Sequence, residues 1–378
     1  MNSELQILAR QLEQARTPEE VFGEISAVGP DQVADLKKSN HRLARAAHPD
    51  AYTGRADQLA AQAAFNRLTD WFEIALTKIE AGRYGRSAGR LDDWRVVLQT
   101  PKRAYVLEAS YEQGPVYTCY PAIFQEGGRS VMVTLKITRD PHDNDLAENE
   151  ARVIQVLRIG KATGKFGSYL PGLLDSFLYT EDGLIRQVNV FKRPAGWYSL
   201  AAVRRAYPSG IDPKDMAWMW QRILVALGFA HLNGVIHRAV LPVNLYILPE
   251  QHGLLLTEWS FALNGPETPG ASIAMLNPAY TGWYPQEVHR QENALTGTDI
   301  DMAARCMIDL LGGDPLIKTM PDTVPQAIRS FFKGCTLAGI RSRPQDAWAL
   351  KEEFDALIQR LWGERKFHPF LMYEPRRV

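Results

Sequence analysis

The sequence has few cysteines, no net charge and no long apolar run. Its 378 residues include only Cys119, Cys306 and Cys335, which are too far apart for a disulfide framework or a zinc-ligand pattern, so we expect a reducing compartment. The 43 basic and 43 acidic residues balance, which argues against nucleic-acid or anionic-membrane partners. No stretch of about 18 apolar residues occurs, and the first residues lack a basic segment followed by an apolar one. These absences predict a soluble cytoplasmic protein.

The length of the chain indicates more than one domain. A sequence of 378 residues suits two or three units of about 100 to 200 residues each. Residues 1–85 are rich in Ala, Leu, Gln and charged residues, and their apolar positions follow helical spacing. Residues 86–104 are rich in Gly and Arg and lose that spacing. We therefore predict a small helical domain followed by a linker that holds one short strand.

The helical domain is predicted to contain two antiparallel helices joined by a tight turn. Asp31 is a suitable cap for the first helix, which runs through VADLKKSNHRLARAA, and the second helix covers roughly residues 57–80. The tripeptide His48-Pro49-Asp50 stands between them. Pro49 ends the first helix, because a proline disfavours helical backbone at the residue before it.

A basic stripe is expected on the first of these helices. Lys38, Arg42 and Arg45 follow one another at spacings of four and three, so they share one side of the helix. Taken alone, the stripe is an ordinary solvated face and the tripeptide is an ordinary exposed turn. Taken together over residues 17–82, they resemble the J domain of the DnaJ family. The resemblance implies that both features bind a DnaK-type heat-shock chaperone and stimulate its ATPase.

The next part of the chain is predicted to form a sheet. Aromatic and β-branched residues dominate YVLEASYEQGPVYTCYPAIF and RSVMVTLKIT, and Gly127-Gly128 between them indicates a hairpin turn. After the segment AENEARVIQVLR, the run LIRQVNVFKRPAGWYSL adds a strand that ends near Pro194 and Gly196.

A long helix and an irregular loop come next. The segment DPKDMAWMWQRILVALGFAHLNG has Asp212 as a cap, Pro213 at its first helical position and Gly234 as a stop signal. The stretch from Phe229 to Leu263 then contains a helix end, a tight loop, a short hairpin and a polar turn.

Residues 105–363 resemble a protein kinase, because several kinase motifs follow in the family's order and spacing. The family's catalytic loop, His-Arg-Asp with an Asn five positions after the Asp, matches residues 237–244. The resemblance implies a small lobe and hinge at 105–196, a helical large lobe at 197–363 and a tail at 364–378. The expected fold class is multidomain: an all-α J domain followed by an α+β bilobal protein-kinase-like fold.

Four residues match positions that bind nucleotide or metal in the kinase family. Lys136, in VTLKI, matches the strand lysine that holds the α- and β-phosphates, and Glu150 matches the helix residue paired with it. Asn244 and Glu258 match the metal-binding positions, and both offer the oxygen ligands that Mg²⁺ prefers. The expected function requires no cofactor, and the binding of ATP and Mg²⁺ is left as an open alternative. Each of these matches has an alternative interpretation that involves no ligand. Lys136 and Glu150 are then two surface charges. Asn244 hydrogen-bonds its own loop, and Glu258 is solvated or paired with Lys136.

Other positions have lost the residues that kinase chemistry needs. Ala239 replaces the Asp that accepts the substrate proton, a contribution usually worth about 10² to 10⁴ in rate. Leu241 replaces the loop lysine that stabilises the transferring phosphoryl group. If Gly114 is the third glycine of the phosphate-covering loop, Ala109 and Tyr111 hold the first two glycine positions. We therefore predict a pseudokinase with no catalytic residues.

Residues of the kinase scaffold are retained. Glu287, in YPQE, matches the glutamate of the family's Ala-Pro-Glu, and Arg343 matches the arginine that pairs with it. Asp299 matches the residue that braces the backbone of the catalytic loop. The resemblance implies that these three residues have structural roles.

These features together predict a J-domain co-chaperone and adaptor. The J domain would recruit a DnaK-type chaperone to an unidentified protein client or partner bound by the pseudokinase. One alternative is an atypical phosphotransferase or nucleotidyltransferase that uses Lys136, Glu150, Asn244 and Glu258. A second alternative is a purely structural scaffold whose helical domain contacts no chaperone.

Overall fold

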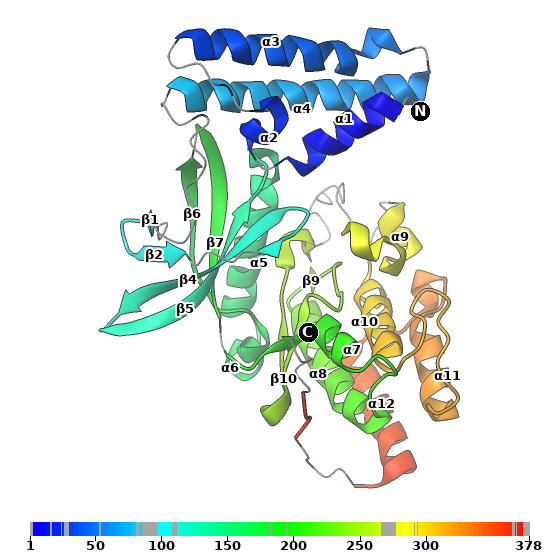
Figure 1. Ribbon diagram of the computed structural model, residues 1–378. Helices are drawn as coiled ribbons and strands as arrows, with labels where there is room; N and C mark the ends of the chain where they lie inside the picture. Colours follow the sequence, from blue (N-terminus) through cyan, green and yellow to red (C-terminus); the bar gives the residue numbers. More distant parts are fainter. Residues whose placement is uncertain are drawn as a thin grey trace. The chain divides into compact units, whose positions relative to one another are not determined.

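The chain divides into two compact units in the computed structural model, one with the N-terminal helices and one with a sheet and a helical lobe (Figure 1). Among the described residues, no helix is both long and apolar enough to cross a membrane. The structure describes residues 3–15, 17–23, 25, 30–52, 54–80, 84, 97–107, 112–181, 183–193, 195–265, 277–290, 292, 294–364, 367 and 369–372.

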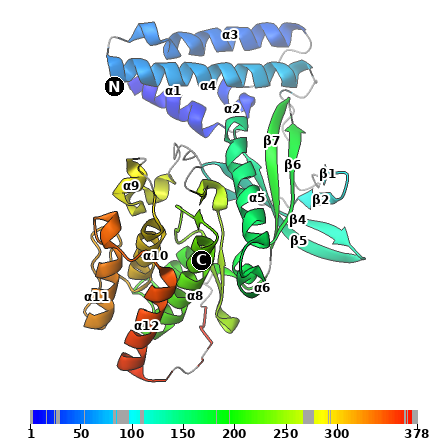
Figure 2. The ribbon, with the colours of Figure 1, turned by 180° about the vertical axis from the view of Figure 1, so that it is seen from behind.

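The first unit is a bundle of helices. Its elements are α1 (Ser3–Gln14), α2 (Pro18–Phe22), α3 (Pro30–Ala47), the 3₁₀ turn η1 (Pro49–Ala51) and α4 (Arg55–Glu80). Helices α3 and α4 lie side by side in both views (Figures 1 and 2). Apolar residues at helical spacing, such as Leu36 and Leu68, are almost completely buried between the helices. Helix α3 begins at Pro30, so Asp31 lies within its first turn and not before it.

A sheet of seven described strands follows, and it belongs to the second unit except for Tyr179–Ile185, which group with the first unit. The seven strands are β1 (Val97–Gln99), β2 (Ala104–Leu107), β3 (Glu112–Gln113), β4 (Tyr117–Glu126), β5 (Arg129–Thr138), β6 (Leu173–Glu181) and β7 (Leu184–Lys192). Their order is β1-β2-β4-β5-β7-β6, with β3 beside β4. Strand β1 lies inside the stretch expected to be a linker with one short strand.

The long hairpin of β4 and β5 has the turn that its two glycines predict. Glu126 pairs with Arg129, which leaves Gly127 and Gly128 as a two-residue turn. Their φ angles of 57° and 77° suit glycine, because other residues rarely adopt positive φ. The register of this hairpin places Cys119 opposite Lys136.

A helix packs beside this sheet and completes the small lobe. The helical elements here are η2 (Pro141–Asp143), α5 (Asn144–Ile159), α6 (Thr163–Phe166) and η3 (Gly167–Tyr169). Helix α5 buries the face that carries Ala147, Ala151 and Ile154. The side-chain oxygen of Asn144 accepts a hydrogen bond from the backbone N–H of Gln187 at 2.7 Å, so the helix start is tied to β7.

The helical lobe is built around the long helix α8 (Pro213–Leu232). Asp212 caps this helix, as the sequence predicts, and Gly234 follows its end with a φ of 71°. The core around α8 contains Trp220, Phe332 and Phe354, which are all almost completely buried. The helices of the lobe are α7 (Leu200–Ala206), α8 (Pro213–Leu232), α9 (Gln286–His289), α10 (Thr296–Leu310), α11 (Gln326–Cys335) and α12 (Ala347–Trp362).

Short strands and 3₁₀ turns complete the helical lobe and carry the loop that follows α8. The strands are β8 (Tyr198–Ser199), β9 (Val235–Ile236), β10 (Leu245–Leu248), β11 (Gly253–Leu256) and β12 (Leu263–Asn264). The turns are η4 (Pro249–Gln251), η5 (Trp259–Phe261), η6 (Pro278–Trp283) and η7 (Ile340–Ser342). Strands β10 and β11 form the hairpin that separates the loop from η5.

Candidate functional site

The loop between β9 and β10 is held by one buried carboxylate. Asp299 accepts hydrogen bonds from the backbone N–H groups of His237 at 2.8 Å and Arg238 at 2.7 Å, and its Oδ2 lies 2.9 Å from Nε2 of His231. Arg238 has a φ of 64°, which is uncommon for a residue with a side chain. Burial opposes ionisation of Asp299, but these hydrogen bonds lower its pKa below the ordinary value. Asp299 therefore braces the loop in its ionised form.

His237 is a buried, neutral part of the same loop. Burial lowers the pKa of its imidazole. Nδ1 accepts a hydrogen bond from the backbone N–H of Ala239 at 3.2 Å, so Nε2 carries the proton and donates to the carbonyl of Thr257 at 2.9 Å. The ring also contacts the buried Trp259 edge to face, with centroids 4.5 Å apart.

The two replaced positions of the loop face apolar surroundings. Ala239, at the position of the kinase base, is 1% exposed. Leu241, at the position of the loop lysine, is equally buried and belongs to the core of the helical lobe. Neither side chain can take up or stabilise charge. The cluster around Ala239 consists of Val116, Tyr117, Leu146, Ala147 and Phe261, with Cys119 at its border.

Asn244 closes the loop on itself. Its side-chain amide donates to the carbonyl of Ala239 at 2.9 Å. Its own carbonyl accepts from the backbone N–H of Thr257 at 2.9 Å and from the Thr257 hydroxyl at 3.0 Å. Asn244 therefore hydrogen-bonds its own loop, as one of the sequence-based alternatives stated.

Three of the predicted site residues meet in a buried charge cluster. Nζ of Lys136, on β5, lies 2.9 Å from both carboxylate oxygens of Glu150, on α5. The same Nζ lies 3.0 Å from Oε2 of Glu258. Burial disfavours the ammonium charge, but the two carboxylates raise the pKa of Lys136 well above its ordinary value. The alternative of surface charges is therefore wrong for Lys136 and Glu150, which are 8% and 1% exposed.

The carboxylate of Glu258 has one paired and one unpaired oxygen in this arrangement. Glu258 has a φ of 67° and a ψ of 63°, and its Oε2 is already paired with Lys136. Its Oε1 is buried and has no hydrogen-bond partner among the described residues. Asn244, the other expected ligand, donates its amide nitrogen to the carbonyl of Ala239, and its side-chain oxygen is the atom that would bind a metal. Within the described ranges, no group of three or more His, Cys, Asp or Glu side chains is arranged to hold a metal.

Residues beyond those expected also contact the charge cluster. The amide of Asn189 donates to Oε2 of Glu150 at 3.2 Å, and the backbone N–H of Trp259 donates to Oε1 at 3.2 Å. The ring of Tyr117 has its centroid 4.1 Å from Nζ of Lys136. The Tyr117 hydroxyl lies 2.6 Å from Oγ of Ser260.

Tyr117 could have been found from the hairpin that the sequence predicts. Residues 114–116 form the turn between β3 and β4, where the N–H of Gly114 donates to the carbonyl of Tyr117. Tyr117 is two residues from Cys119, the partner of Lys136, and alternate residues of a strand share a face. Ala109 and Tyr111, which the sequence placed in this loop, lie outside the described residues.

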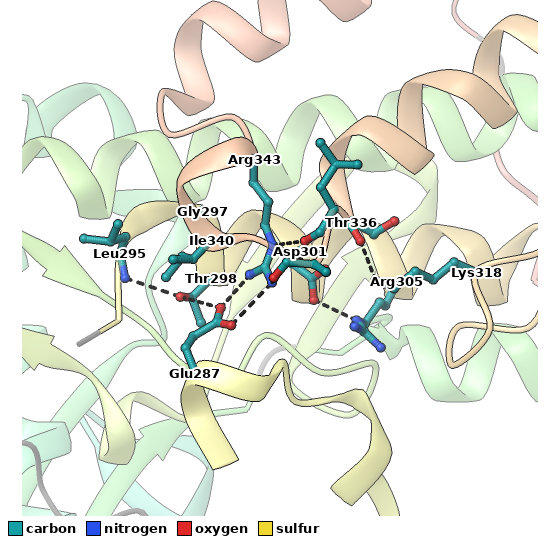
Figure 3. A network of polar contacts seen from close by, with 12 residues as sticks. Glu287, Leu295, Gly297, Thr298, Asp301, Arg305, Lys318, Thr336, Ile340 and Arg343 are labelled. Carbon is teal, nitrogen blue, oxygen red and sulfur yellow. Dashed lines mark hydrogen bonds and ion pairs between the residues drawn. The ribbon is translucent and has the colours of Figure 1, made fainter. Parts of the chain in front are cut away.

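The scaffold residues form a second buried network (Figure 3). Arg343 donates to Glu287 at 2.5 and 3.3 Å, and the hydroxyl of Thr298 donates to the same carboxylate at 3.1 Å. Nε of Arg305 lies 2.7 Å from Oδ2 of Asp301, one helical turn earlier on α10. The sequence predicted the first pair and missed the second, although its i,i+4 spacing was visible.

The tripeptide of the first unit lies at the turn after α3. His48 is exposed, and its ring contacts Phe65 of α4 edge to face with centroids 5.8 Å apart. Pro49 begins η1 and is half-buried. The hydroxyl of Tyr52 donates to the carbonyl of Ala46 at 2.6 Å, which fixes the turn against the helix end. The side chain of Asp50 lies outside the described part of the structure.

The expected basic stripe lies on α3. Lys38, Arg42 and Arg45 are all exposed on this helix. Lys38 pairs with Asp35 at 3.1 Å, but both side chains are solvated, so this pair contributes little to stability. The stripe is open to solvent in this unit.

The comparisons with known proteins found distant relatives. No protein-family model matches the chain. The chain is 23% identical over 189 residues to cyclin-dependent kinase-like 2 of Rattus norvegicus, a match that covers 42% of this chain and 35% of that protein. The Oryctolagus cuniculus and Mus musculus proteins match at 23%, over 42% of this chain and 32% of each. The chain thus spans about a third of the length of these relatives.

This similarity is distant, and it agrees with the observed folding of the second unit into a sheet-rich lobe and a helical lobe. The chain therefore contains a kinase-like fold. The comparisons give no support to a J domain and do not bear on catalysis.

Proposed function

We propose that the chain is a J-domain co-chaperone and adaptor whose kinase-like domain does not transfer phosphate. The observation that carries the proposal is the exposed His48 at the turn between α3 and α4. The helical unit would recruit a DnaK-type chaperone in the cytoplasm. The kinase-like domain would bind the protein client or partner brought to that chaperone.

The charge of α3 supports the chaperone contact. Lys38, Arg42 and Arg45 are exposed on the helix that ends at His48. A solvated positive face attracts an acidic surface and speeds association, and salt weakens such attraction. The turn and the basic face together offer a docking surface for an acidic partner.

The chemistry of the kinase-like loop supports the absence of phosphate transfer. A general base at position 239 is replaced by a methyl group in an apolar cluster, and a cation at position 241 is replaced by a buried leucine. General-base catalysis contributes about 10² to 10⁴ in rate, and loss of electrostatic stabilisation lowers the rate further. The scaffold pair of Glu287 and Arg343 is meanwhile intact, so the fold does not depend on the lost chemistry.

Binding to a purified DnaK-type chaperone tests the adaptor proposal. Arg42→Glu should weaken binding by about tenfold or more, and added salt should weaken wild-type binding, because the contact is electrostatic. Arg67→Glu reverses an exposed charge on α4 and serves as the matched control. Binding that neither Arg42→Glu nor salt affects would contradict docking through α3, and would favour the purely structural role.

One observation favours an enzyme as the second candidate. Lys136 and Glu150 keep the ion pair expected of a phosphate-binding site, at 2.9 Å. An atypical phosphotransferase or nucleotidyltransferase would use this pair with Asn244 and Glu258, and would need a base from elsewhere. Incorporation of phosphate or nucleotide into a substrate distinguishes this candidate from the adaptor.

A further inference from the structure

Tyr117 connects the sheet of the small lobe to the turn that follows β11. Its side chain is 4% exposed, and its hydroxyl lies 2.6 Å from Oγ of the fully buried Ser260. Its ring centroid is 4.1 Å from Nζ of Lys136, well within the range of a cation–π contact. The ring therefore covers the ammonium group that would otherwise face a bound phosphate.

The apolar surroundings of Tyr117 match the substitution at position 239. Val116, Phe261 and Ala239 are each less than a tenth exposed and belong to the same cluster as the tyrosine ring. A carboxylate at position 239 would lose solvation in this apolar cluster. Ala239, which stands where the kinase family has its base, and the buried Tyr117 thus pack in the same apolar cluster.

Further bonds hold the same turn from α5 and β5. The amide of Asn149 donates to the carbonyls of Ser260 at 2.8 Å and Ala262 at 3.0 Å. Lys136 pairs with Glu258 at 3.0 Å, where a kinase-like site would place a metal ion. The strand, the helix and the turn are therefore joined by the chain's own side chains.

We propose that the Tyr117–Ser260 contact closes the cleft of the kinase-like domain against nucleoside triphosphates. The tyrosine ring takes the room of the phosphates, and the Lys136 ammonium holds Oε2 of Glu258. The two lobes then keep one arrangement without a ligand, which gives a binding partner a constant surface. The inference rests on the kinase-like fold and is independent of the proposed chaperone contact.

Equilibrium binding of Mg-ATP to the full chain tests this proposal. We expect no saturable binding to the wild type, because Lys136 is covered, and binding at least about tenfold tighter in Tyr117→Ala. Adding Lys136→Ala to Tyr117→Ala should remove the gain. Phe124→Ala removes another buried aromatic ring of β4 and is the matched control, which should gain no binding. Circular dichroism and thermal unfolding without ligand establish that each variant is folded.

Two further measurements test the proposal without relying on Tyr117→Ala alone. Tyr117→Phe removes only the hydroxyl, so it should gain less binding than Tyr117→Ala. An ATP acyl-phosphate probe, which labels lysines next to a bound nucleotide, should leave Lys136 unlabelled in the wild type even if Tyr117→Ala does not fold. Wild-type binding as tight as that of Tyr117→Ala, a folded Tyr117→Ala without binding, or ATP-competed labelling of wild-type Lys136 would each overturn the proposal. Chaperone binding is measured separately and is expected to be unchanged in these variants.

Discussion

Glu287 and Arg343 form a buried, two-pronged ion pair that joins α9 to the segment before α12. Their contacting nitrogen and oxygen atoms lie 2.5 and 3.3 Å apart, and the two residues are 4% and 5% exposed. Arg343 also donates to the carbonyls of Leu337 at 2.6 Å and Ala338 at 3.1 Å. A single guanidinium therefore satisfies a carboxylate and two backbone groups.

Breaking this pair should destabilise the kinase-like domain strongly. Arg343→Ala leaves the Glu287 carboxylate buried without its partner, which typically lowers the free energy of unfolding by about 3 to 5 kcal/mol. Chemical denaturation of the full chain, followed by fluorescence, measures the change. Arg290→Ala removes one member of an exposed pair with Glu292 and should change stability by about 0.5 kcal/mol or less. Similar losses from the two variants would show that the buried pair is not a major source of stability.

The stability of the kinase-like domain should fall in mildly acidic solution because of His237. Burial lowers the pKa of this histidine in the folded state, so the unfolded chain binds more protons below the ordinary histidine pKa of about 6.5. The contribution is present above about pH 6.5 and is lost as the pH falls toward the folded-state pKa, by at most about 1.4 kcal/mol per pH unit.

Denaturation of the wild type and His237→Phe between pH 7.5 and about pH 5 measures this effect. The variant should show a flatter pH dependence than the wild type, because it has no imidazole to protonate. His41→Gln removes an exposed histidine of the first unit and is the control, which should keep the wild-type dependence. A wild-type dependence retained in His237→Phe would assign the effect to other groups.

No phosphorylation of the chain itself or of generic substrates is expected with Mg-ATP. Ala239 and Leu241 stand where the chemistry needs a base and a cation, and both are buried. Incorporation of labelled phosphate measures this activity. The control is the double variant Lys136→Ala with Glu258→Ala, in which contaminating kinase activity would persist. Incorporation that is present in the wild type and absent from the double variant would establish the enzyme instead.

The charge cluster shows which parts of the site were predictable. Lys136 and Glu150 could be matched by sequence because their residue types and local motifs are retained. The pairing of Glu258 with Lys136 was one of the alternatives that the sequence offered. Counting glycines did not indicate Tyr117, whereas the predicted Gly127-Gly128 turn sets the register that places Cys119 opposite Lys136 and Tyr117 on the same face. The contact of Tyr117 with Ser260, 143 residues later, depends on tertiary packing that sequence spacing does not indicate.

The second network shows a different limit. The spacing of Asp301 and Arg305 is visible in the sequence, but such pairs are usually solvated and weak on a helix surface. Here the two residues are 0% and 6% exposed, because α10 lies in the interior of the lobe. Burial, which follows from the tertiary arrangement, turns an ordinary pair into part of the core.

The central claim is tested most directly by the single-turnover ATPase rate of a DnaK-type chaperone with the full chain added. The account predicts that the wild type accelerates hydrolysis and that His48→Gln abolishes the acceleration while leaving the helical unit folded, because the His48 side chain is exposed. Arg67→Glu should stimulate like the wild type. Equal rates with wild type, His48→Gln and no added chain would contradict the co-chaperone function.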